Sequence, residues 1–83
     1  MPHVYVRLFP GRTEQQKREF AQRIVEAGKQ TLGTSEGGMS VAIEEIPKEQ
    51  WEEQVYKPLI VAKPELLYKK PGYKLENGEF TSL

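Results

Sequence analysis

The stretch PHVYVRLFPGRTEQQKREF, residues 2–20, contains the change of pattern that decides the fold. Residues 2–9 alternate valine or leucine with polar and aromatic residues, which is typical of a strand. The pair Pro10-Gly11 breaks regular structure. Thr13 is followed three residues later by a glutamine, as in a helix capping box. The stretch therefore predicts a strand, a turn and the start of a helix.

The remainder of this pattern predicts a second strand after the helix. The helix is expected to end at Leu32, since Gly33 suits its C-terminal stop. Its apolar residues share one stripe, so it packs on one side. After a polar, glycine-rich loop, residues 39–46 (MSVAIEEI) alternate again. A strand, a helix and a strand in succession predict two parallel strands joined by a right-handed crossover, in an α+β domain.

The C-terminal segment is predicted to be irregular or to contain short helices. Residues 48–57 (KEQWEEQVYK) suit a short helix, and Pro58 and Pro64 are expected to divide the chain after it. Residues 76–79 (ENGE) suit a hairpin turn or a frayed tail. We expect one domain over residues 1–83, with residues 76–83 as its tail.

Composition excludes several classes of protein. The chain of 83 residues has no cysteine and one histidine, which rules out disulfides and thiolate metal sites. Twelve Lys and Arg balance twelve Asp and Glu, unlike the basic excess of nucleic-acid binders. No apolar run reaches the length of a membrane span, and no signal-peptide pattern occurs at the start. We expect a cytoplasmic protein that binds neither nucleic acid nor membrane.

The small size of the domain points to self-association. A domain of this length buries only about 60% of the surface that its unfolded chain exposes. Two strands and one helix also leave sheet edges open. We expect a homodimer, in which two copies join into a four-stranded sheet with helices on one face.

Pro2 is the first candidate for chemistry. A Met-Pro start is normally trimmed, which leaves Pro2 with a secondary amine in place of an amide. An α-amino group has an ordinary pKa of roughly 8, and partial burial or nearby cations lower the pKa toward neutral. A base of that strength suits proton transfer next to a carbonyl. The plain alternative is a proline at the start of a strand.

Arg12 is the second candidate, because it follows the turn at the end of the first strand. If a neighbouring subunit brings it near Pro2, its guanidinium would bind a carboxylate and stabilise enolate charge. Arg7 is a further cation on the first strand. A solvated role remains open for both arginines.

Several short stretches form one pattern: Pro2, Gly11-Arg12, the following Thr-Glu-Gln-Gln-Lys, Ile43-Glu44-Glu45, Trp51 and Lys69-Lys70-Pro71-Gly72-Tyr73. Together they resemble the 4-oxalocrotonate tautomerase family. Trp51 and residues 69–73 look most like its bacterial PptA-type, phenylpyruvate-tautomerase-like branch. The resemblance covers about residues 2–75.

The resemblance implies a cofactor-free, metal-free isomerase, a keto–enol tautomerase. Pro2 matches the family's general base, Arg12 its carboxylate-binding arginine and Trp51 the aromatic wall of its pocket. Ser40 stands where the family has a second arginine, and a serine supplies no charge for a second carboxylate. The implied substrate is therefore a monoacid such as phenylenolpyruvate. The branch resembles dimers, and residues 58–83 are expected to cap the surface on which hexamers stack.

Other interpretations stay open at this point. A hydratase or dehalogenase acting on a short unsaturated acid would need Glu45 or Glu53 to activate water. A non-catalytic binding or structural protein would keep the fold alone. Tyr68 and Tyr73 reach a pocket or anchor the terminal segment, and His3 is a strand or interface residue. Glu44 and its neighbour Glu45 are expected on opposite faces of the sheet, which excludes a carboxylate dyad.

Overall fold

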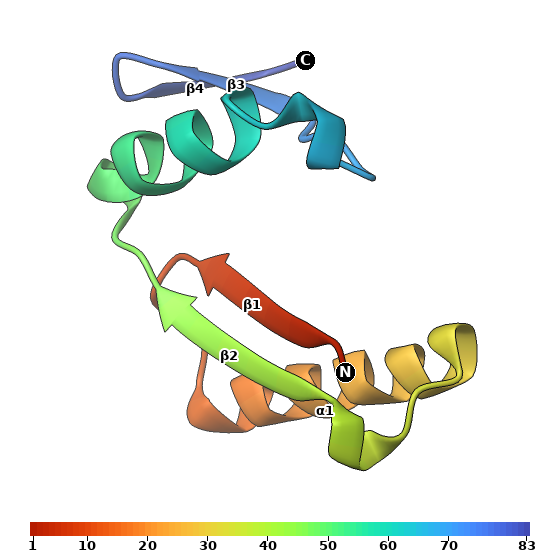
Figure 1. Ribbon diagram of the computed structural model, residues 1–83. Helices are drawn as coiled ribbons and strands as arrows, with labels where there is room; N and C mark the ends of the chain where they lie inside the picture. The colour runs from red at the N-terminus through yellow and green to blue at the C-terminus, as the bar shows by residue number, and fades with distance from the viewer. The chain divides into compact units, whose positions relative to one another are not determined.

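A computed structural model describes residues 1–83, and the chain forms two compact units, Met1–Glu45 and Ile46–Leu83. Each unit is described by itself (Figure 1). No helix in the structure has both the length and the apolar composition needed to cross a bilayer.

The first unit is the predicted β-α-β arrangement. Strand β1 (His3–Leu8) pairs in parallel with β2 (Ser40–Glu45), in a register that sets His3 opposite Ser40 and Arg7 opposite Glu44. Helix α1 (Glu14–Leu32) connects the two strands and lies along one face of the pair (Figure 1). A single-turn 3₁₀-helix, η1 (Glu36–Gly38), precedes β2. The α+β class and the parallel pair are thus confirmed.

The ends of α1 are set by its own sequence. The Thr13 hydroxyl accepts a hydrogen bond from the Gln16 N–H at 3.0 Å, and the Gln16 side chain accepts one from the Thr13 N–H at 2.8 Å. This reciprocal pair is the predicted capping box. At the other end Gly33 takes a left-handed conformation with φ 67°, which costs glycine little. Both predicted ends are confirmed.

The first unit has a thin core. Gly28 in α1 is its one buried residue, and the Met39 side chain occupies the space beside it. Phe20 and Leu32 on the same helix remain 46% and 69% exposed. Both side chains therefore leave apolar surface uncovered in one copy of the unit.

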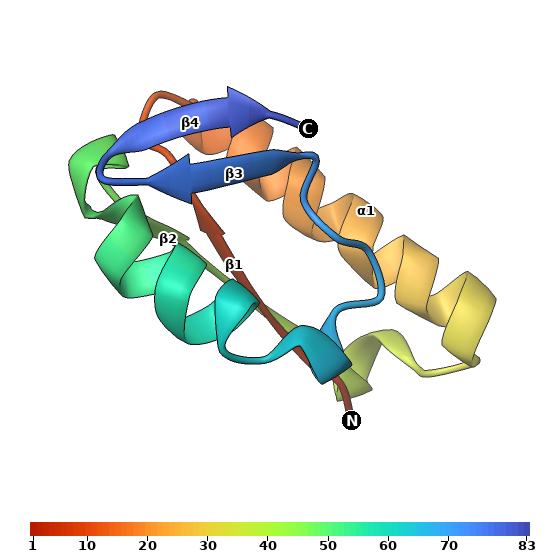
Figure 2. The same cartoon turned by 90° about the horizontal axis from the view of Figure 1, so that it is seen from above.

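The second unit packs a π-helix against a hairpin. The 3₁₀-turn η2 (Lys48–Gln50) leads into the π-helix η3 (Glu52–Val61), and a further 3₁₀-turn, η4 (Pro64–Leu66), follows. Strands β3 (Tyr73–Glu76) and β4 (Glu79–Ser82) run antiparallel beside each other, as Figure 2 shows. The three buried apolar side chains of this unit are Ile46, Val55 and Leu75.

The prediction that Pro58 ends the helix is wrong. The helix predicted over residues 48–57 exists, but it continues through Pro58 to Val61. A proline ring clashes with the carbonyl four residues earlier in an α-helix. The π-helix bonds five residues back, as Ala62 N–H to Lys57 carbonyl does at 3.0 Å, and this wider winding accommodates the ring.

The segment Glu76–Glu79 forms the hairpin turn, one of the two predicted alternatives. Asn77 and Gly78 both have positive φ, 49° and 81°, as a two-residue turn of type I′ requires. The tail predicted for residues 76–83 is therefore corrected, because Glu79–Ser82 pair with β3 as β4. The Leu83 N–H also donates to the Gly72 carbonyl at 3.0 Å.

Candidate active site

Pro2 lies at the start of β1 with its nitrogen outside the strand pairing. Its carbonyl accepts the Ser40 N–H at 3.2 Å, so the ladder between β1 and β2 begins at the carbonyl of Pro2. Pro2 is half-buried, whereas Met1 is fully exposed. Removal of Met1 would free the Pro2 nitrogen without breaking any bond of this ladder.

Ser40 and His3 form a polar pair directly beside Pro2. The two residues face each other across the strands, and His3 Nδ1 lies 2.6 Å from the Ser40 hydroxyl oxygen. A hydroxyl both donates and accepts hydrogen bonds, so Ser40 brings a polar group without a formal charge to this end of the strand pair.

The sheet face that carries this pair continues with an ionic cluster. The Tyr5 hydroxyl and Arg7 Nε both donate to Glu44 Oε1, at 2.8 and 3.2 Å. The Arg7 guanidinium also lies over the Tyr5 ring, 4.4 Å from its centre. The hydrogen bond to the Glu44 carboxylate raises the pKa of Tyr5. Arg7, an open candidate in the sequence, is thus engaged with Glu44 in this structure.

Neighbouring glutamates point to opposite faces, as predicted. Glu44 contacts the cluster just described, whereas Glu45 meets Lys17 of α1 at 3.5 Å. Lys17 also contacts Glu14 at 2.7 Å, and this hydrogen bond raises the pKa of Lys17 and lowers that of Glu14. The two glutamates therefore do not form a carboxylate dyad.

Arg12 is exposed beyond the opposite end of β1 from Pro2. It lines a hollow of about 260 Å³ with Leu8, Gln16, Lys17 and Phe20. Six strand steps separate Pro2 from Leu8, a distance of about 20 Å, before the chain reaches Arg12. One copy of the chain therefore does not bring Pro2 and Arg12 to the same reacting group.

Trp51 belongs to the second unit and is anchored by the hairpin there. Its indole N–H donates to the Tyr73 hydroxyl at 3.0 Å in a part-buried position. The Tyr73 ring also contacts Tyr56 and Phe80, with ring centres 5.7 and 5.5 Å apart. Tyr73 therefore takes the anchoring role of the two left open, while the side chain of Tyr68 is fully exposed. Tyr56 and Phe80 were not predicted as neighbours of Trp51; the position of Phe80 two residues after the Asn77-Gly78 turn was a signal for Phe80 alone.

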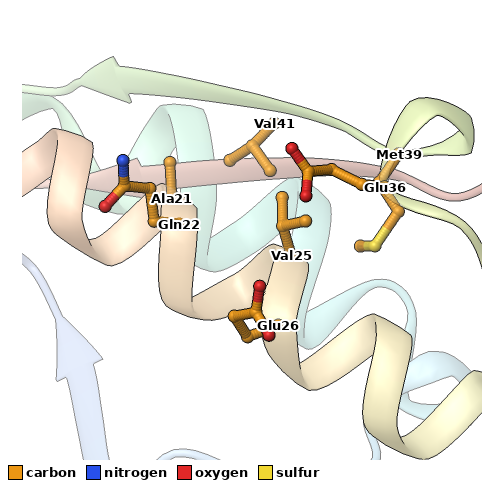
Figure 3. Close-up of a pocket in the computed structure, with 7 residues that line it drawn as sticks. All are labelled: Ala21, Gln22, Val25, Glu26, Glu36, Met39 and Val41. Atoms are coloured by element: carbon orange, nitrogen blue, oxygen red, sulfur yellow. The ribbon is translucent and has the colours of Figure 1, made fainter.

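A hollow of about 550 Å³ in the first unit contains none of the predicted site residues. Figure 3 shows Ala21 and Val25 of α1 pointing toward Val41 of β2. The carboxylates of Glu26 and Glu36 also line it. Lys29 already pairs with both carboxylates, at 3.4 and 3.5 Å, so this hollow offers no unpaired cation to a carboxylic acid. The structure also places no three acidic or histidine side chains together as a metal site would need.

Comparison with known proteins identifies the family of this chain. The tautomerase enzyme family matches residues 2–55. A probable tautomerase of Xylella fastidiosa is 40% identical over 73 residues, which span 88% of this chain and 89% of the relative. This chain belongs to the tautomerase family. It is an isomerase, a keto–enol tautomerase, as the resemblance implied.

Other tautomerases of the family support the same branch and fold. Tautomerase PptA of Pectobacterium carotovorum is 38% identical over 74 residues, covering 88% of this chain and 97% of the relative. The crystal structure of YwhB, a homologue of 4-oxalocrotonate tautomerase, matches with a TM-score of 0.56 and 44% identity. That match covers 58% of this chain and 79% of the YwhB chain. This chain therefore belongs to the PptA-like branch of the 4-oxalocrotonate tautomerase family.

Proposed function

We propose that this tautomerase converts a small enol monoacid, of the phenylenolpyruvate type, to its 2-oxo form with Pro2 as general base and acid. One observation carries the proposal: the ladder between β1 and β2 begins at the carbonyl of Pro2. The ring nitrogen is therefore positioned by β1 yet not used by it. Removal of Met1 gives that nitrogen a basic lone pair. Cytosolic aminopeptidases perform this removal, so the proposed mechanism favours a cytoplasmic location.

The proposed reaction needs one proton to leave oxygen and one to reach carbon. The Pro2 nitrogen accepts the proton of the enol hydroxyl, and the oxygen electron pair forms the C=O bond. The electrons of the C=C bond then form a new C–H bond at C3 with the proton of the Pro2 ammonium. Atoms and charge balance, and Pro2 returns to its neutral state. This cycle uses no cofactor or metal.

Arg12 is proposed to bind the substrate carboxylate from a second copy of the chain. Arg12 lies beyond the far end of β1 from Pro2, about 20 Å away along the strand. A site with both residues is therefore complete only between two copies. The exposed Phe20 and Leu32 side chains leave apolar surface for such a partner. We propose a homodimer with a four-stranded sheet.

Ser40 and Trp51 are proposed to set the choice of substrate. Ser40 lies beside Pro2 and bonds to His3, so that end of the site holds a serine hydroxyl where the family has a second arginine. A hydroxyl supplies no charge to a second carboxylate, which disfavours a dicarboxylate such as 2-hydroxymuconate. Trp51 is proposed as the aromatic wall for the side chain of the substrate.

The water-activating alternative gains no support from the carboxylates it needs. Glu45 is paired with Lys17, and Glu53 with Lys57 at 2.8 Å. Both carboxylates are thus occupied by lysines of their own unit. Neither carboxylate is free to activate water, so we do not propose hydration or dehalogenation for this chain.

The test compares Pro2→Ala with a matched Pro64→Ala control, since Pro64 is exposed at the start of η4. Each amino terminus is first verified by mass spectrometry, and the loss of phenylenolpyruvate absorbance is followed. Loss of a general base lowers kcat/KM by roughly 10²-fold or more. We expect that loss in Pro2→Ala and in protein that retains Met1, with full activity in Pro64→Ala. Unchanged rates in the protein that retains Met1, whose Pro2 nitrogen is an amide without basicity, would remove Pro2 from the mechanism.

A further inference from the structure

The hydrogen bond between Trp51 and Tyr73 joins the two parts of the second unit. Trp51 stands between η2 and the π-helix, and Tyr73 is the first residue of β3. Its indole nitrogen and the tyrosine oxygen are 3.0 Å apart, in a part-buried position. An indole has one N–H, so this bond fixes the edge of the ring that carries it.

The tyrosine that receives this bond is itself held on two sides. Tyr56 of the π-helix and Phe80 of β4 contact its ring, and both contacts are tilted. Leu75, two residues along β3, is 3% exposed, and Val55 of the π-helix is 6% exposed. The hydroxyl of Tyr73 is therefore part of a packed structure, not of a mobile side chain.

The residue after Trp51 holds the other end of the hairpin. The Glu52 carboxylate accepts the N–H groups of Asn77 at 3.2 Å and of Gly78 at 2.8 Å. Residues 51 and 52 thus bind the start of β3 and the turn that follows it. The hairpin and the start of the π-helix are held at two points, so the position of one depends on the other.

We propose that Tyr73 is a positioning residue that sets the orientation of Trp51 and so the preference for substrates with an aryl side chain. The inference rests on the proposed function, in which Trp51 contacts the side chain of the substrate. Aromatic contacts depend on the angle between the rings, so a fixed indole favours an aryl group presented in one orientation. The β3–β4 hairpin then acts as a specificity element, with arylalkyl 2-oxo acids as the favoured class.

The test is the variant Tyr73→Phe, which keeps the ring contacts and removes only the hydroxyl. The matched control is Tyr68→Phe, because the Tyr68 side chain is fully exposed. Deuterium exchange at C3 is followed by NMR for phenylpyruvate and for 2-oxobutyrate, which has no ring. Loss of one hydrogen bond of ordinary strength predicts a KM for phenylpyruvate that is roughly 3- to 10-fold higher. We expect kcat for phenylpyruvate, and both constants for 2-oxobutyrate, to stay unchanged.

A spectroscopic readout reports on the same bond without turnover. Trp51 is the single tryptophan of the chain, so intrinsic tryptophan fluorescence comes from this residue alone. We expect Tyr73→Phe to shift its emission and Tyr68→Phe to leave it unchanged. In a Trp51→Phe background, Tyr73→Phe is expected to change KM no further, because the bond is already absent.

The outcomes separate this inference from the proposed function. Full activity in protein that retains Met1 overturns the proposed function itself. If Pro2→Ala is inactive and Tyr73→Phe has the kinetic constants of the parent for both substrates, only the role of Tyr73 is overturned. An equal rise in KM for both substrates, or an additive effect in the Trp51→Phe background, would also overturn that role, since it would show a loss of structure unrelated to the indole.

Discussion

Replacing Glu52 with glutamine tests how strongly the π-helix holds the hairpin turn. The Glu52 side chain is 16% exposed, and its two oxygens accept the N–H groups of Asn77 and Gly78. Glutamine keeps one acceptor oxygen but turns an amide donor toward the other N–H. One charged hydrogen bond is lost and the other becomes neutral. Hydrogen bonds to charged groups contribute about 1.5–3 kcal/mol and neutral ones about 1 kcal/mol, so the loss of one bond and the weakening of the other predict a destabilisation of about 2–4 kcal/mol.

The control for this change is Glu53→Gln. Glu53 has the same charge on the same helix, is 73% exposed and pairs only with Lys57 among the ionic contacts of the structure. Exposed pairs of this kind contribute less than about 1 kcal/mol. Urea unfolding followed by Trp51 fluorescence reports on the unit that contains both glutamates. Equal destabilisation by the two variants, at equal protein concentration, would refute the role assigned to Glu52.

Three further outcomes follow from the first unit. Ser40→Arg is expected to raise kcat/KM for 2-hydroxymuconate at least about 10-fold, because one hydrogen bond to a charged group contributes that much. An absorbance assay measures the change, and the control Ser82→Arg on β4 is expected to have no effect. Thr13→Ala removes the cap of α1 and should cost about 1 kcal/mol in urea unfolding, whereas a loss below 0.3 kcal/mol would show that water replaces it. Gly28→Ala is expected to be neutral or stabilising by up to about 1 kcal/mol, because the new methyl displaces only the flexible end of Met39 and meets Thr34 Cγ2 at an ordinary 3.5 Å. Gly28→Val should destabilise in thermal unfolding.

The parts of the fold that the sequence predicted are those with local causes. Thr13 and Gly33 end α1 through bonds and angles within a few residues of themselves. The continuation of the helix through Pro58 was missed, because proline statistics describe α-helices and the winding here is wider. The contact of Trp51 with Tyr73 joins residues 22 positions apart and depends on how the hairpin packs. The spacing of apolar residues along the sequence does not predict such a contact.

In the candidate site, too, the contacts made within one strand pair were predictable and those made over longer distances were not. The sequence singled out Pro2, Arg12, Ser40 and Trp51, and the structure brings Ser40 to Pro2 through strand pairing. Arg12 stays beyond the other end of β1, because a strand of this length separates its two ends by about 20 Å. A second copy of the chain is proposed to bring Arg12 to Pro2. The sequence of one chain contains no pattern that predicts a contact between two copies.

The ladder bond from Ser40 to the carbonyl of Pro2 has a practical consequence for anyone who produces this protein. An affinity tag fused to the amino terminus would leave that bond and the whole fold in place, because neither uses the Pro2 nitrogen. It would also turn that nitrogen into an amide without basicity. On the proposed mechanism, such a preparation is folded, pure and inert. A tag after Leu83, whose side chain is exposed, avoids the problem.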